Sequence, residues 1–164
     1  MLCSCTATQT PQPAAPAART PGLSAPPLYL TAREAYDQAL PLIEAWEPQA
    51  RLVHVAVRWP SPGGRSPDWL LYFASDQQGL RVVKNGQRLQ VQTPPSASLN
   101  PLPECWLDSD EIIRRLQDLS QSTQAVYSMA LHSEGHWELI QTEQHWQLAA
   151  CSGLLASKPE PDLL

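Results

Sequence analysis

Apolar residues recur at helical spacing in two stretches of the chain, and a helix-start signal precedes each stretch. Thr31 and Glu34 form the pattern of a capping box, in which a hydroxyl and a carboxylate three residues later bind the free amides of a first helical turn. Asp108 and Glu111 repeat this spacing. Apolar side chains then return at the spacing of an α-helix behind each pair. The pattern predicts two amphipathic helices, each with one face in a core.

Runs typical of β-strands follow each predicted helix. Many of them alternate apolar and polar residues, and turn residues separate them; the Asn85-Gly86 pair is a strong signal for a tight hairpin. The chain is therefore predicted to belong to the α+β class, with helices packed on antiparallel sheet. The predicted strands are 52–59, 69–74, 80–84 and 88–92 after the first helix, and 125–131, 136–141 and 145–151 after the second.

The two halves of the chain share one order of elements, a helix followed by an antiparallel meander. We interpret them as degenerate tandem αβββ units, 30–93 and 105–156, joined by a proline-rich connection, 94–104. Trp69 and Trp137 stand at matching positions in the two units. A unit of about 50 residues is marginal alone, so the halves should share a continuous sheet or pack their helix layers together. The alternative is that an ordinary α+β domain contains two such segments by chance.

Composition limits what the chain can bind. It has 164 residues, 17 prolines and a formal net charge of −5 at pH 7. Without an excess of basic residues, we expect no face that neutralises nucleic-acid phosphates. No apolar run reaches the roughly 18 residues of a membrane-spanning helix. Residues 1–29 carry one charge and six of the prolines, so we predict a disordered tether there and a disordered tail at 157–164.

The start of the chain resembles a bacterial lipobox. Leu2-Cys3-Ser4-Cys5 contains an aliphatic residue, two small residues and then a cysteine, and the resemblance implies that Cys5 takes a lipid after cleavage of a signal peptide. The proline-rich tether behind Cys5 is of the kind that lipoproteins carry between lipid and domain. We therefore predict an extracytoplasmic protein that is anchored to the bacterial cell membrane through lipid alone. The alternative is a disordered cytosolic tail with two incidental cysteines.

A turn of small residues, Ala149-Ala150-Cys151-Ser152-Gly153-Leu154-Leu155, closes the last predicted strand. A helix followed by a three-stranded meander with such a closing turn resembles the PepSY family of extracytoplasmic domains. The resemblance covers residues 30–155, taken as two copies. It implies a small non-catalytic domain, of a kind sometimes proposed to inhibit peptidases. It offers no active-site residue to carry over to this chain.

The candidate for metal chemistry is the group His132, Glu134 and His136, with Glu138 and His145 downstream. A three-residue turn would place His132 and His136 opposite one another, close enough for two ligands. The pattern differs from the helical His-Glu-x-x-His of zinc peptidases. His145 begins the next predicted strand, on the order of 20 Å from the pair, which should leave it out. We expect exposed hairpin histidines and no metal, with a small metal-dependent enzyme as an alternative function.

Cys105 and Cys151 flank the second predicted unit. Cys105 precedes the second predicted helix, and Cys151 ends the last predicted strand. In an exported protein the two could form a disulfide. The alternative is a pair of buried free thiols. The sequence does not give the distance between the two cysteines, so both states stay open.

Trp59 and Trp106 flank the proline-rich loops, where a half-exposed indole can anchor a partner. The alternative is that each indole caps the edge of the core. The chain has no serine-nucleophile elbow and no phosphate-binding loop. We therefore expect a module without catalysis or cofactor that contacts a protein or peptide partner through a sheet face or through loops 59–68 and 94–106. A PepSY-like peptidase inhibitor is the second hypothesis.

Overall fold

A computed structural model describes much of the chain from residue 27 onward. Several predictions concern residues outside this description: the tether with Cys5, the Asn85-Gly86 turn, most of the connection 94–104 and the tail from 158. The described ranges are 27–76, 79–84, 87–89, 100–120, 125–142 and 144–157.

The described residues form two helices and eight strands, and the α+β class is confirmed. Helix α1 spans Ala32–Glu44 and helix α2 spans Ser109–Ser120, so both begin where the sequence pattern predicted. Within the described ranges, neither helix has the length and apolar character needed to cross a bilayer. The strands are β1 (Arg51–Arg58), β2 (Leu70–Ser75), β3 (Gly79–Lys84), β4 (Gln87–Leu89), β5 (Ser128–His132), β6 (His136–Ile140), β7 (His145–Ala149) and β8 (Leu155–Ser157).

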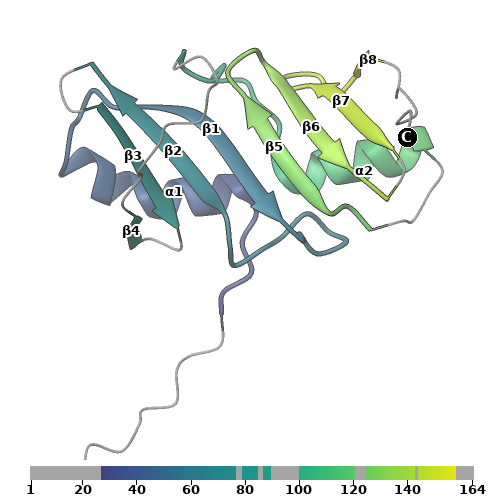
Figure 1. Cartoon of the computed structure of the whole chain (residues 1–164), viewed down its shortest axis with the longest axis horizontal. Helices are drawn as coiled ribbons and strands as arrows, with labels where there is room; N and C mark the ends of the chain where they lie inside the picture. The colour runs from purple at the N-terminus through teal and green to yellow at the C-terminus, as the bar shows by residue number, and fades with distance from the viewer. Residues whose placement is uncertain are drawn as a thin grey trace, which may run out of the picture.

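The strands form one antiparallel sheet in the order β4-β3-β2-β1-β5-β6-β7-β8. The first strand after each helix is innermost, because β1 and β5 pair at the centre, with Val55 opposite Leu131 and Val57 opposite Met129. Both helices lie behind this sheet in the view of Figure 1, one behind each half. The sheet therefore has one face covered by helices and one face that neither helix covers.

The core lies between the helices and the covered face of the sheet. Trp69 and Trp137 are fully buried there, and their rings meet edge to face with centroids 6.5 Å apart. Each indole N–H donates to a carbonyl two residues before a helix: Trp69 to Leu30 at 2.8 Å, and Trp137 to Leu107 at 3.0 Å. These bonds satisfy the one polar group that each buried indole carries.

The capping box predicted at the start of α1 is confirmed. The Thr31 hydroxyl accepts a hydrogen bond from the Glu34 amide at 3.2 Å, and the Glu34 carboxylate accepts one from the Thr31 amide at 3.0 Å. The start of α2 differs from the expected repeat of this motif. Glu111 uses its carboxylate to bind the guanidinium groups of Arg114 and Arg115 within the helix.

Instead, the residues at the start of α2 also cap α1. The Asp108 carboxylate accepts hydrogen bonds from the Ser109 amide at 2.7 Å and from the Arg33 amide at 2.9 Å. The Ser109 hydroxyl accepts from the Ala32 amide at 2.9 Å and donates to the Gly64 carbonyl at 2.7 Å. The free amides at both helix starts therefore share one set of capping groups, which ties the two halves together.

Candidate functional site

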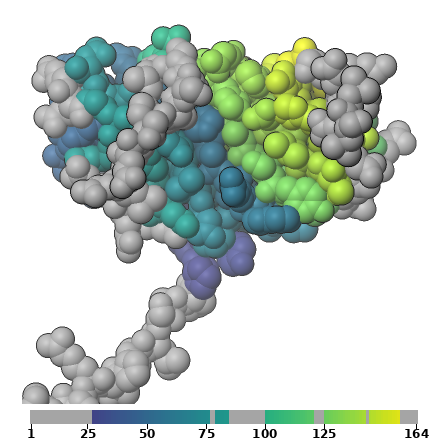
Figure 2. All heavy atoms as spheres, in the orientation of Figure 1, coloured from purple at the N-terminus to yellow at the C-terminus, as the bar shows by residue number. Residues whose placement is uncertain are grey.

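The candidate site lies on the face of the sheet that the helices leave uncovered, which we call the open face. Side chains alternate along a strand, so on β1 the open-face positions His54, Ala56 and Arg58 alternate with the buried Val55 and Val57. Figure 2 views the molecule from this side. The residues that the strand registers assign to the open face include Leu70, Tyr72, Val82, Lys84, His54, Ala56, Arg58, Ser128, Ala130, His132, His136, Glu138, Ile140, His145 and Gln147.

A hollow of about 440 Å³ opens where β1 ends. The small residues Ala56 and Ser128 line it from the paired strands β1 and β5. Leu70 and Tyr72 line it from β2, and Trp59 follows β1 directly. Its volume lies in the range of roughly 300–1,000 Å³ that small-ligand sites occupy. The hollow can therefore hold a small molecule or the end of a peptide.

Trp59 has an unusual backbone conformation beside this hollow. Its φ angle is 57°, in the left-handed region that bulky residues rarely adopt. Its amide donates to the Tyr127 carbonyl at 2.7 Å, and its ring meets the Tyr127 ring edge to face with centroids 4.6 Å apart. Even so, 68% of Trp59 is exposed, as expected of a contact residue. Strained conformations of this kind concentrate at ligand-binding positions.

Of the two cations that line the hollow, one has no ion-pair partner among the described residues. Lys84 lies with its Nζ 2.9 Å from the Asp68 carboxylate. Arg58 lines the same hollow, is exposed, and forms no ion pair with any residue in the described ranges. The hollow is therefore a positively charged spot on a chain whose net charge is −5.

All four histidines of the chain lie on the open face, each on a different strand. The ring centroids of His54 and His132 are 5.0 Å apart, as are those of His132 and His136. Glu138 connects this group to the last histidine. Its carboxylate lies 3.1 Å from Nε2 of His132 and 2.6 Å from Nε2 of His145. We call these five residues the histidine cluster.

Burial and neighbouring charges give the members of the histidine cluster different protonation states. Burial, and then the nearby His132, lowers the pKa of His54 to about 4. The same two causes lower the pKa of His136. Burial acts to raise the pKa of Glu138, but hydrogen bonds and charges from His132 and His145 outweigh it and hold the pKa below its usual value. At neutral pH the cluster therefore contains a neutral His54 and an ionised Glu138.

The predicted pairing of His132 and His136 across their hairpin is confirmed, and Glu134 is exposed in the turn between them. The prediction that distance would separate His145 from this pair is wrong. Glu138 stands in the middle of the short strand β6, so its side chain reaches diagonally to both His132 and His145. Within the described ranges, no three His, Cys, Asp or Glu side chains are arranged to hold a metal ion.

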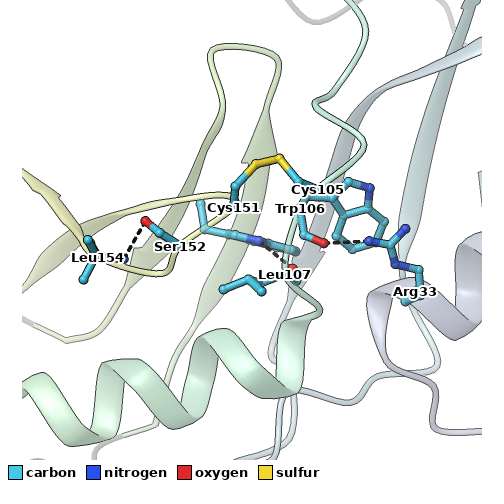
Figure 3. The surroundings of a disulfide bond; sticks show 8 residues. Arg33, Cys105, Trp106, Leu107, Cys151, Ser152 and Leu154 are labelled. Carbon is cyan, nitrogen blue, oxygen red and sulfur yellow. Dashed lines mark hydrogen bonds between the residues drawn. A yellow bond between two sulfur atoms is a disulfide. The ribbon is translucent and has the colours of Figure 1, made fainter.

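The prediction that Trp106 is a half-exposed contact residue is wrong, because only 5% of it is exposed. Its ring packs edge to face against Tyr36 and Trp137, with centroids 6.4 and 6.3 Å away. The Arg33 guanidinium lies 3.7 Å from the centroid of the indole and donates to the Trp106 carbonyl at 2.6 Å (Figure 3). Since α1 and β6 both supply aromatic partners, Trp106 caps the edge of the core.

Cys105 and Cys151 form a disulfide across the second half of the chain (Figure 3). Their Cα atoms are 5.0 Å apart, within the usual range of roughly 4.4–6.8 Å for a disulfide. Both residues are exposed. Next to them the Leu107 amide donates to the Ala150 carbonyl at 2.7 Å. The alternative of buried free thiols therefore does not describe this fold.

Sequence reasoning did not single out His54 or Arg58 as functional residues. A signal for them exists, because both alternate with the buried valines of β1 and so share the face opposite the core. The sequence does not give the pairing of β1 with β5, which brings His54 beside His132.

Comparisons with models of protein families, with curated proteins and with solved structures found no match for this chain. The resemblance to PepSY domains stays a prediction. The open face is the candidate functional site, because it carries both the hollow and the histidine cluster.

Proposed function

We propose that this chain is a non-catalytic binding module that holds a protein or peptide partner on its open face. The observation that carries the proposal is Trp59, which is 68% exposed and yet fixed against Tyr127 beside a hollow of about 440 Å³. Large aromatic side chains at hollows are the usual anchors of binding surfaces. A side chain that is already fixed also loses little conformational entropy when a partner binds.

The shape of the open face supports the same proposal. Ala56 and Ala130 face each other across the two innermost strands. These small residues leave room in the middle of the face, between Leu70 on β2 and Glu138 on β6. The end of an extended peptide can therefore lie over these two alanines at the centre of the sheet.

Cross-linking from within the hollow tests the binding proposal. A photoreactive amino acid at Ser128, in the full-length protein in its own bacterium, should link the chain to a partner protein. Trp59→Gly should remove this link, and glycine is the matched replacement because it adopts a φ of 57° without strain. The control position is Leu119, which is 48% exposed on α2. A link to the same partner from both positions, or one that survives Trp59→Gly, would contradict the proposal.

We propose further that the module is extracytoplasmic and lipid-anchored. The disulfide between Cys105 and Cys151 supports this location, because disulfides persist in oxidising compartments. The lipobox-like start supports attachment at Cys5, with residues 6–29 as the tether.

Metabolic labelling tests the proposed anchor. The protein expressed from its chromosomal gene should incorporate a fatty-acid analogue, and Cys5→Ser should abolish the label. In the same cells, alkylation before reduction should leave Cys105 and Cys151 unmodified. Alkylated cysteines at these two positions would place the protein in a reducing compartment and overturn the proposed location.

We also propose that the two halves are a degenerate αβββ repeat with a short extra strand at each sheet edge. Each half runs from a helix into its strands, and the two innermost strands pair at the centre of the sheet. The hydrogen bonds of Trp69 and Trp137 are equivalent, since each indole donates to the carbonyl two residues before the helix of its own half. Such an equivalence is what a duplicated unit would retain.

A further inference from the structure

We propose that the hollow beside Trp59 binds the C-terminus of a peptide whose last residue is large and apolar. The inference rests on the proposed function, because it names the chemistry of the partner at the same site. It depends on two features that lie side by side in the hollow: a cation for the carboxylate and an apolar wall for the last side chain.

Arg58 supplies the cation. It ends β1, lines the hollow and forms no ion pair within the described ranges. Lys84, the second cation of the hollow, lies 2.9 Å from Asp68, so its charge is already balanced. A guanidinium presents paired N–H donors that match the two oxygens of a carboxylate. The hollow therefore offers one place for a negative group, on a chain whose net charge of −5 otherwise repels anions.

Trp59 supplies the apolar wall, together with Leu70 and Tyr72 of β2. The small Ala56 leaves space between these side chains. Burial of a large apolar side chain against these residues favours binding. The hollow therefore adds an apolar contribution to binding next to the cation.

Arg58 and Trp59 place the cation and the apolar wall next to each other in the hollow. Consecutive residues of a strand point to opposite faces of a sheet. Arg58 is the last residue of β1, Trp59 follows it outside the strand with a positive φ, and both line the hollow. The carboxylate and the apolar group that they bind must then be close neighbours in the ligand.

Within a peptide, a carboxylate and a large apolar side chain belong to one residue only at the C-terminus. An aspartate or glutamate carries its charge on the side chain itself, where the apolar group would have to be. The juxtaposition of one unbalanced cation and one aromatic wall therefore favours a C-terminal residue such as leucine or phenylalanine.

Two matched pools of hexapeptides test this inference on the full, oxidised chain. Both pools contain the same sequences ending in leucine or phenylalanine, one with free C-terminal carboxylates and the other with C-terminal amides. We expect calorimetric titration to give about ten-fold tighter binding, or more, for the free acids. Arg58→Gln should remove this difference between acids and amides. The matched control is Arg51→Gln, exposed at the other end of β1, which should change neither.

The remaining outcomes separate this inference from the proposed function. A third pool of amidated peptides carries an internal glutamate beside phenylalanine, and tighter binding of this pool than of the free acids would overturn the C-terminal assignment. Equal binding of acids and amides that Trp59→Gly abolishes would overturn the inference and leave the proposed function standing. Binding of no pool would also overturn it, while cross-linking from Ser128 decides the proposed function independently.

Discussion

At the scale of single residues, Gly64 determines how closely the two halves approach. A Cβ at this position would lie 2.6 Å from the carbonyl oxygen of Ser109, and its φ angle is +71°. Glycine is the residue that accepts both conditions without strain. The loop around Gly64 is therefore fixed where it meets the start of α2.

Gly64→Ala should destabilise the protein strongly. The added methyl group meets backbone, which cannot rotate away, and alanine is strained at this φ, so we expect a loss of about 2 kcal/mol or more. The control is the neighbouring Gly63→Ala, where no atom lies within 4 Å of the added Cβ. It should change the free energy of unfolding by less than about 0.5 kcal/mol. Urea denaturation measures both, and equal effects would contradict the close approach.

Protonation of His54 should destabilise the fold in acid. Its pKa is about 4 in the folded chain against 6.5 for a free histidine, so between these pH values the unfolded state binds more protons. Stability therefore falls as the pH falls, by at most about 3 kcal/mol for this group, and the lowered pKa of His136 acts in the same direction.

His54→Phe tests this pH dependence. Phenylalanine keeps a ring beside Tyr72, whose centroid is 5.2 Å away, but takes up no proton. We expect the variant to lose less stability than the natural chain between pH 6.5 and pH 4.5 in urea denaturation. The lowered pKa of Glu138 acts below this window, because the carboxyl protonates in the unfolded state only near pH 4.5. Parallel stability curves for the two chains would refute the role of His54.

At the scale of elements, the sequence predicted the helices better than the strands. Helix-start signals are local, and both α1 and α2 begin beside the residues that carry them. Strand β8 was not predicted, because three residues show no alternation and depend on pairing with β7. The capping of α1 by Asp108 could not be predicted either, since this hydrogen bond joins residues 75 positions apart.

Trp69→Phe and Trp137→Phe should reduce stability by similar amounts. Each substitution removes the indole that satisfies a carbonyl at a helix start and leaves space in the core, so we expect a loss of about 2 kcal/mol in each case. The exposed Trp59→Phe is the control and should leave the free energy of unfolding within about 0.5 kcal/mol of its original value. A large loss from one core tryptophan and a negligible loss from the other would contradict their equivalence.

At the scale of the whole molecule, the candidate site depends on a pairing that local sequence does not encode. Alternation along β1 gives the face on which His54 and Ala56 lie, but only the pairing with β5 brings them beside His132 and Ala130. The two tryptophans near proline-rich loops illustrate the same limit. Their local signals are alike, yet Trp59 is exposed and Trp106 is buried. Tyr36, Trp137 and Arg33 pack around Trp106, whereas the ring contact of Trp59 is with Tyr127.

The central strand pairing and the shared helix caps should make the two halves unfold as one unit. This can be tested through the disulfide, which closes 46 residues within the second half and should contribute about 2–4 kcal/mol. If unfolding is cooperative, reduction of the disulfide must lower the protection from hydrogen exchange equally for β2 amides in the first half and for β6 amides in the second half. Native-state hydrogen exchange measures both, and a chain with Cys105→Ser and Cys151→Ser controls for the reductant. Loss of protection confined to β5, β6 and β7 would mean that the halves unfold independently despite their shared caps.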